Sequence, residues 1–183
     1  MTQHRRMSRE ERRKQILASA LKVFIEKGYD RSTTLDIAKE AQVSEVTLFR
    51  HFESKRLIFM EAIEPVLLES FQESIKNSRN LEPVDHLEQI FKSRVEFVSE
   101  HQDVIKLILM ESQINPEVGD FDFINQMTSL MRSSVKDAGI QIRDEDFAVR
   151  MIVGGILSFL YLPKLNDEEI DLYTKKLIKK IID

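Results

Sequence analysis

The sequence predicts an all-α fold of about nine helices, and three observations carry this prediction. Apolar residues recur at helical spacing along most of the 183-residue chain. Ser, Thr and Asp residues stand just before several of these stripes, where their side chains cap helix N-termini. The chain also contains only five glycines and four prolines, so few residues interrupt the helices.

The composition argues against a secreted or membrane-spanning protein. The chain contains no cysteine, which excludes a disulfide framework and fits a cytosolic protein. Residues 1–15 lack the apolar stretch of a secretory signal. The longest nearly apolar run, residues 151–162, is too short for a bilayer, which needs about 20 residues. We therefore expect a cytoplasmic protein that does not enter the membrane.

The first helix is expected to begin after Ser8 and to end at Gly28. Ser8 and Glu11 have the spacing of a capping box, and glycine is the usual residue just past a helix C-terminus. The apolar stripe of this helix is formed by Ile16, Leu17, Ala20, Leu21 and Phe24.

Residues 33–55, TTLDIAKEAQVSEVTLFRHFESK, predict two short helices joined by a tight turn. Thr33 and Asp36 form a capping box for the first of these helices, Ser44 caps the second, and Ser54 caps the helix that follows. Small and apolar residues at Ile37, Ala38, Ala41, Val43 and Leu48 let the two helices cross closely. This helix-turn-helix spacing is typical of proteins that place a helix in the major groove of DNA.

The rest of the chain is expected to be helical, with loops at residues 80–83 and 115–120. Pro65 lies inside the first of these later helices and is expected to kink it. One expected helix covers residues 54–77, and the next runs from the loop at 80–83 to about residue 100. Four more are expected over residues 101–110, 121–138, 144–162 and 167–182. Asp167 is the expected N-cap of the last helix.

The charge distribution also favours nucleic-acid binding by the N-terminal part. Through residue 60 the chain has 13 Lys and Arg against 8 Asp and Glu, and from residue 61 onward it has 14 against 23. The basic part thus coincides with the helix-turn-helix, as expected if phosphates bind there. A chance fluctuation along a highly charged chain is the alternative.

Two segments resemble the TetR family of bacterial transcriptional regulators. They are residues 24–29, FIEKGY, and residues 33–55, and the similarity extends over roughly residues 9–62. It implies a three-helix DNA-binding domain over residues 1–53 and a helical ligand-binding and dimerisation domain over residues 54–183. Gln42 and Phe49 depart from the family pattern, which usually has glycine and tyrosine there. Residue 42 lies in the turn, where a left-handed backbone is expected.

The recognition helix is expected over residues 44–51, and Thr47 and Lys55 match family positions that touch DNA. Arg50 could read guanine through two hydrogen bonds, and Glu45 could accept one from cytosine. Arg50 as a solvated side chain and His51 as a packing residue are the alternatives. The full set of predicted DNA contacts is Thr33, Thr34, Ser44, Glu45, Thr47, Phe49, Arg50, His51 and Lys55. The basic arm, Arg5, Arg6, Arg9, Arg12 and Arg13, either follows the DNA backbone or enters a minor groove, or is merely solvated.

A single helix-turn-helix makes few base contacts, so we expect a homodimer on a palindromic operator. The last two helices are the predicted interface, because the stretch 151–162 is apolar nearly all round. The predicted interface residues are Gly154, Gly155, Ser158, Ile170, Tyr173, Leu177 and Ile181. A buried core helix in a monomer is the alternative.

The middle helices are rich in Phe and Met, which suits a pocket for a small, largely apolar effector. The candidate lining residues are Phe71, Phe91, Met110, Phe123, Met127, Met131, Met151 and Phe159. Plain core packing is the alternative for each of them. The resemblance implies a repressor that the effector releases from its operator, and a regulator controlled by a protein partner is the second possibility.

An enzyme is the remaining alternative class. The four histidines show no metal-ligand spacing with carboxylates, and the chain has neither a Gly-rich phosphate loop nor a nucleophile motif. The sequence therefore predicts neither a catalytic site nor a cofactor nor a metal.

Overall fold

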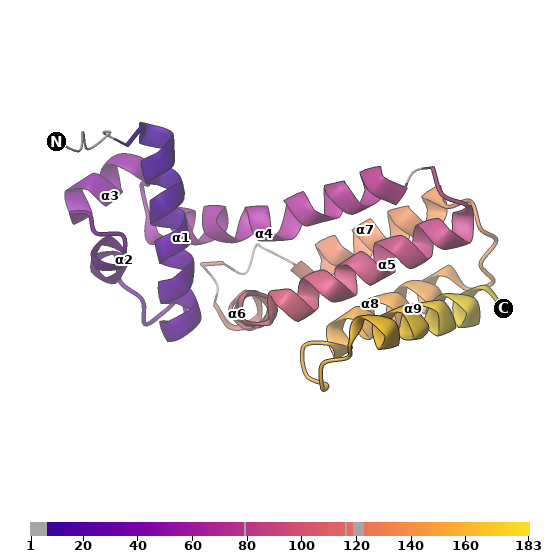
Figure 1. The fold of residues 1–183 in the computed structure, drawn as a ribbon. Helices are drawn as coiled ribbons and strands as arrows, with labels where there is room; N and C mark the ends of the chain where they lie inside the picture. The colour runs from indigo at the N-terminus through magenta and orange to yellow at the C-terminus, as the bar shows by residue number, and fades with distance from the viewer. Residues whose placement is uncertain (1–6, 79, 116, 119–122) are drawn as a thin grey trace. The chain divides into compact units, whose positions relative to one another are not determined.

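The computed structural model describes residues 7–78, 80–115, 117–118 and 123–183, with backbone alone for residues 66–77 and 123. In this part of the chain the structure has nine helices and no strand (Figure 1), which confirms the predicted all-α fold. Contacts divide the chain into two compact units. The first comprises Met1–Val66 and Met110–Phe121, and the second comprises Leu67–Leu109 and Asp122–Asp183.

The first unit contains helix α1 (Arg9–Lys27), α2 (Thr34–Glu40), α3 (Glu45–His51) and the start of α4 (Lys55–Ser78). The predicted caps are present. Ser8 forms a capping box with Glu11, Thr33 forms one with Asp36, and the Ser44 hydroxyl accepts the Thr47 N–H. The Ser54 hydroxyl likewise accepts the Leu57 N–H at the start of α4. Local sequence therefore determines where each of these helices begins.

Helices α2 and α3 cross over a few small and apolar side chains. Ile37, Ala38 and Leu48 are buried at this crossing, and α1 contacts α2 from its other side. The Gln15 side chain on α1 also donates a hydrogen bond of 3.1 Å to the carbonyl oxygen of Ala41, where α2 ends. The helix-turn-helix is thus fixed on α1.

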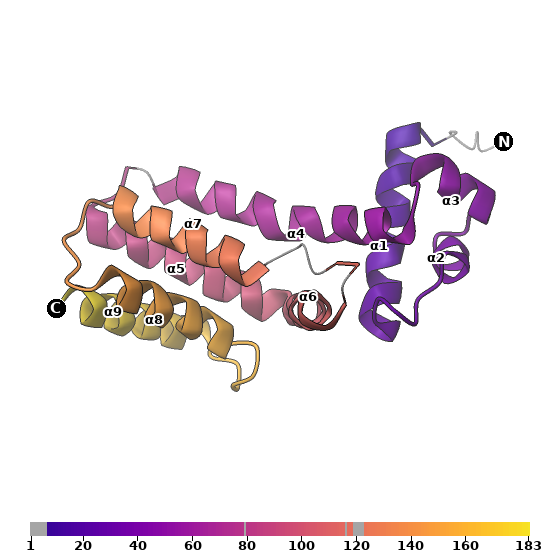
Figure 2. The ribbon, with the colours of Figure 1, turned by 180° about the vertical axis from the view of Figure 1, so that it is seen from behind.

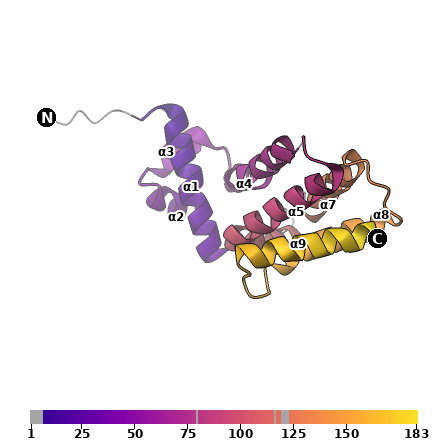
Figure 3. The same ribbon diagram turned by 45° about the vertical axis from the view of Figure 1, so that its right-hand side comes forward.

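The second unit is a helical bundle around α5 (Pro83–Glu100). This helix contacts α7 (Phe123–Asp137), α8 (Glu145–Ser158) and α9 (Asp167–Ile182). Figure 2 shows α7 beside α8, and Figure 3 shows α9 running along α5. Helix α6 (Gln102–Ile114) is divided between the units. Its residues up to and including Leu109 belong to the second unit, and its last residues, from Met110 on, belong to the first.

Three helix boundaries differ from the predictions. Helix α6 extends to Ile114 instead of residue 110, and the N-cap of α9 is Asn166 instead of Asp167. Helix α8 ends at Ser158 instead of residue 162, because the next N–H groups bond carbonyls three residues back. Pro163 then disfavours a helical backbone at the preceding residue. Pro65 lies inside α4, as predicted.

Gln42, in the turn between α2 and α3, has a φ of 53°, which confirms the left-handed backbone expected there. A residue with a Cβ pays a steric cost in this region that glycine does not. We expect Gln42→Gly to leave stability unchanged or raise it by about 1 kcal/mol at most, since glycine also gains freedom in the unfolded chain. Urea unfolding measures this, with Gln42→Ala as the control that keeps the Cβ. A clear loss of stability in Gln42→Gly would contradict the assignment of the turn.

Candidate DNA-binding surface

The outward face of α3 carries Val46, Phe49 and Arg50, all exposed. Val46 is 64% exposed and Phe49 is 50% exposed, whereas Leu48 on the opposite side is fully buried. Apolar side chains of this size on a surface helix are free to contact another molecule. Val46 was not among the predicted contacts. Its spacing of three and four residues from Phe49 and Arg50 is the signal that places it on the same face.

Arg50 is exposed, and the described residues offer its guanidinium neither a hydrogen bond nor an ion pair. It projects from the last turn of α3. An unpaired guanidinium beside exposed apolar side chains can donate two parallel hydrogen bonds to a guanine edge without breaking any internal interaction.

Thr34 and Glu45 bind each other in the free protein. The Thr34 hydroxyl donates a hydrogen bond of 2.7 Å to a carboxylate oxygen of Glu45, so this pair links the first turn of α2 to the first turn of α3. Both side chains were predicted to face DNA. The Glu45 oxygen in this bond connects α3 to α2 and is therefore not available to accept a hydrogen bond from a DNA base.

Ser44 and Thr47 are also joined, at the N-terminus of α3. Their hydroxyl oxygens lie 3.0 Å apart, and the Ser44 hydroxyl accepts the Thr47 N–H. Both hydroxyls remain near the surface, where each retains capacity for a further hydrogen bond to a phosphate.

His51 packs against its own domain. Its Nδ1 atom is buried and has no hydrogen-bond partner among the described residues, and its ring lies beside Phe52. Burial lowers the pKa of His51 from its ordinary value of 6.5, and the positive charges of Arg9, Arg13 and Arg12 lower it further. The ring is therefore neutral near pH 7, which favours the packing alternative over a phosphate contact.

Lys55, predicted to bind phosphate, binds two backbone carbonyls. Its ammonium donates hydrogen bonds of 3.0 Å to the carbonyl of Tyr29 and 3.2 Å to that of Ser32. It also lies 4.2 Å above the centre of the Tyr29 ring. An ammonium has three N–H donors, so one at most remains for DNA.

Part of the basic arm is likewise engaged in the fold. The Arg13 guanidinium binds the Glu61 carboxylate and the His51 carbonyl, and it stacks over the Phe52 ring. Arg12 donates a hydrogen bond to Gln15, whereas Arg9 is exposed. Arg5 and Arg6 lie outside the described residues.

The start of α2 is fixed by an ion pair with α1. The Lys27 ammonium lies 2.8 Å from the Asp36 carboxylate. Lys27, followed by the Thr33 hydroxyl and N–H, lowers the pKa of Asp36 to about 2. Thr33 is exposed, but its hydroxyl donates to this same carboxylate, which leaves the oxygen of Thr33 less available to DNA.

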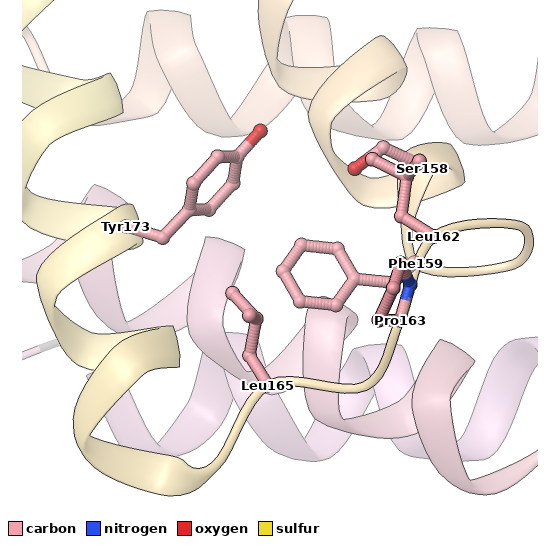
Figure 4. A pocket seen from close by; sticks show the side chains of 6 residues that line it. All are labelled: Ser158, Phe159, Leu162, Pro163, Leu165 and Tyr173. Atoms are coloured by element: carbon pink, nitrogen blue, oxygen red, sulfur yellow. The ribbon is translucent and has the colours of Figure 1, made fainter.

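The second unit has an apolar pocket of about 250 Å³ between the end of α8 and α9 (Figure 4). Its lining residues are Ser158, Phe159, Leu162, Pro163, Leu165 and Tyr173. Of the predicted ligand-pocket residues, Phe159 lines it. Phe91, Met127 and Met131 are buried in the core, and Met110 and Met151 are exposed. The side chains of Phe71 and Phe123 lie outside the described residues.

Most of the predicted interface residues are covered within a single chain. Ile170, Leu177 and Ile181 are buried, because this side of α9 packs on α5 and α8. A Cβ at Gly155 would lie 2.9 Å from a Leu177 methyl carbon, so this glycine serves the close approach of α8 to α9 of the same chain. Gly154 has open space in front of it.

Residues 16–62 match the model of the family described as "Bacterial regulatory proteins, tetR family". The nucleoid occlusion factor SlmA of Haemophilus influenzae is 30% identical over 121 residues, which are 61% of this chain and 55% of SlmA. The chain thus aligns with about half the length of that relative.

The other similarities cover nearly the whole chain. The uncharacterised HTH-type transcriptional regulator YvkB of Bacillus subtilis is 24% identical over 91% of this chain and 90% of its own. The structure of AibR in complex with isovaleryl coenzyme A and operator DNA has a TM-score of 0.70 and 15% identity, covering 93% of this chain and 98% of AibR. The helix-turn-helix fold thus defines the class, that of DNA-binding regulators. Residues 16–62 carry the DNA-binding region of the TetR family, and the chain as a whole has the fold of a TetR-family regulator.

We expect Lys55→Gln to destabilise the fold, because it removes a charged donor from the partly buried carbonyls of Tyr29 and Ser32. The loss should be about 1–3 kcal/mol, measured by urea unfolding. Lys39→Gln, at an exposed lysine of α2, is the control and should be close to neutral. If Lys55→Gln instead left stability unchanged and reduced the salt dependence of DNA binding by about one phosphate, Lys55 would be a DNA contact.

Proposed function

We propose that this protein is a dimeric repressor that binds a palindromic operator and is released by a small, largely apolar effector. The observation that carries the DNA-binding part is the exposed face of α3. Val46, Phe49 and Arg50 project from a helix whose own position is fixed by the Thr34–Glu45 bond and the buried Leu48. A rigid helix with a free outward face suits the reading of base edges in a major groove.

The three side chains suit different features of the bases. The Arg50 guanidinium matches the two acceptors of guanine, and the apolar Val46 and Phe49 side chains match the methyl group of thymine. Ser44, Thr47 and the exposed backbone at the start of α2 are the candidates for phosphate contacts. An operator half-site would then combine at least one G·C pair with adjacent thymines.

Two copies are required because one short helix buries too little surface for tight specific binding. The exposed sides of α8 and α9 are the proposed interface. Phe147 is 53% exposed, Met151 is 37% exposed, and Gly154 lies one helical turn further along. Apolar residues at this spacing form a stripe along α8 that a partner helix can cover.

The pocket of Figure 4 is the proposed effector site. Its Phe159, Leu162 and Leu165 side chains favour an apolar ligand, and the Tyr173 hydroxyl offers one polar group. Because the pocket is lined by the end of α8 and by Tyr173 of α9, the two helices of the proposed interface, a ligand there would favour one dimer geometry over another. The effector would then weaken DNA binding through its differential affinity for the two geometries.

Control by a protein partner is the second candidate. A thermal-shift screen with small apolar and cationic molecules separates the two. A stabilising compound whose effect is lost in Phe159→Ala supports the effector, whereas a screen without any stabilising compound favours a protein partner.

The DNA-binding proposal is tested by selecting randomised duplex DNA with the purified protein and sequencing what is retained. We expect enrichment of an inverted repeat whose half-sites are about one helical turn apart. Retention without any enriched sequence at low salt would show that the protein binds DNA only through its charge.

On the enriched duplex, we expect Arg50→Ala to weaken binding by about 1–3 kcal/mol for each half-site, because it removes two hydrogen bonds to guanine. Fluorescence anisotropy with the enriched duplex and with a scrambled duplex measures this. Arg31→Ala is a suitable control, since Arg31 is exposed and lies outside α3. Equal losses on the two duplexes would make Arg50 a backbone contact.

A further inference from the structure

The helix-turn-helix carries one carboxylate whose charge the described part of the chain leaves unbalanced. Residues 33–51 contain three carboxylates, those of Asp36, Glu40 and Glu45. Asp36 pairs with Lys27 at 2.8 Å, and Glu40 pairs with Lys22 at 3.7 Å. Glu45 forms no ion pair with any residue that the structure describes. A negative charge therefore remains on a domain proposed to bind a polyanion.

Glu45 lies beside the side chains proposed to meet the bases. It is in the first turn of α3, next to Val46 and four residues before Phe49, so it shares a side of the helix with Phe49. Val46 is 64% exposed and Phe49 is 50% exposed. Capping does not account for Glu45, because the Ser44 hydroxyl already caps α3. The dipole at a helix N-terminus only makes the charge tolerable there.

The carboxylate of Glu45 is held in place by Thr34. The Thr34 hydroxyl donates its hydrogen to the Oε1 atom of Glu45 at 2.7 Å, which leaves the Oε2 atom able to accept from another molecule. Both residues are half-buried. The bond therefore keeps the charge at the edge of the outward face of α3, where it would otherwise be able to turn into solvent.

We infer that Glu45 is a specificity-determining residue that rejects DNA other than the operator, with Thr34 as its positioning residue. Every duplex brings phosphate charges toward this carboxylate and removes water from it, which is unfavourable for an uncompensated charge. A cytosine at the facing position offers an amino N–H to Oε2 and offsets this loss. A duplex without an amino group there is penalised, and such a penalty against the wrong partner is a source of specificity.

This inference rests on the proposed DNA-binding function and adds a second contribution to it. Arg50, Val46 and Phe49 favour the operator through attraction, whereas Glu45 acts by weakening the binding of other sequences. A purely structural function would need only an acceptor for the Thr34 hydroxyl, and a neutral glutamine supplies one as well. Glu45→Gln therefore separates the charge from the hydrogen bond.

The central experiment measures the affinity of Glu45→Gln for the enriched and the scrambled duplex by fluorescence anisotropy. We expect its affinity for the scrambled duplex to rise about fivefold, because one charge close to the phosphates has been removed. Its affinity for the enriched duplex should not rise, since the favourable charge on the cytosine contact is lost as well. The ratio of the two affinities should thus fall by about fivefold or more. A misfolded variant could not bind more tightly.

Glu40→Gln is the matched control. It makes the same change of charge in the helix-turn-helix, at an exposed residue of α2 whose carboxylate already pairs with Lys22. The ratio of the two affinities should change by less than about twofold, as expected for a charge in a surface ion pair.

Thr34→Val tests the positioning, because it removes the hydroxyl and nearly keeps the shape. In the Thr34→Val background the carboxylate is no longer held at the edge of α3, so adding Glu45→Gln should change the ratio much less than it does in the wild type. This difference is the coupling that a double-mutant cycle measures. An undiminished effect of Glu45→Gln in this background would show that Thr34 does not position the carboxylate.

The outcomes separate the inference from the proposed function. If the wild type prefers the enriched duplex but Glu45→Gln raises both affinities equally, or Glu40→Gln lowers the ratio as much, Glu45 is only a general negative charge. The inference is then wrong and the DNA-binding function stands. A wild type that binds both duplexes equally would overturn both.

Discussion

The helices of the first unit, which carries the helix-turn-helix, are arranged around the buried side chain of Tyr29. Its ring lies between Phe24 of α1 and Phe59 of α4, with ring centres 5.8 and 5.1 Å away, and it is almost fully buried. Burial on this scale is favourable only if each polar atom of the residue finds a partner. The N–H donates to Glu111, the carbonyl accepts from Lys55, and the hydroxyl donates to Glu117. Burial, followed by the bond to Glu117, also raises the pKa of this hydroxyl well above its ordinary range.

This residue explains why the end of α6 belongs to the same compact unit as the helix-turn-helix. Glu111 is buried, and a Cβ atom at position 28 would lie 3.3 Å from its carboxylate oxygen. Gly28 also has a φ of 78°, so both space and backbone favour glycine there. The Asn115 amide donates to Asp30, and Arg56 donates to the Glu117 carbonyl. The end of α6 therefore contacts the segment that joins α1 to α2 and the start of α4, all within the first unit.

The helix caps and the tight turn of the helix-turn-helix could be predicted from the sequence. The caps at Ser8, Thr33 and Ser44 and the left-handed turn at Gln42 depend on neighbouring residues, and the structure has them as predicted. The contacts of Tyr29 with Glu111 and Glu117 join residues more than 80 positions apart, and no local pattern specifies them. The stripe on α9 shows the same limit. Its spacing predicted that Ile170, Leu177 and Ile181 are covered but not that the same chain covers them. Lys55 matches a DNA-contact position of the family, yet its ammonium donates hydrogen bonds to the backbone carbonyls of Tyr29 and Ser32.

In the proposed function, a rigid unit built around Tyr29 presents the outward face of α3 to DNA. Hydrogen–deuterium exchange of the protein, alone and with the duplex enriched by selection, tests this arrangement. We predict added protection over residues 44–51 and at the start of α2, and none at these positions with a scrambled duplex at moderate salt. Protection confined to the exposed lysines of α9, Lys175, Lys176, Lys179 and Lys180, or equal protection of α3 by both duplexes, would show that α3 does not read the base sequence.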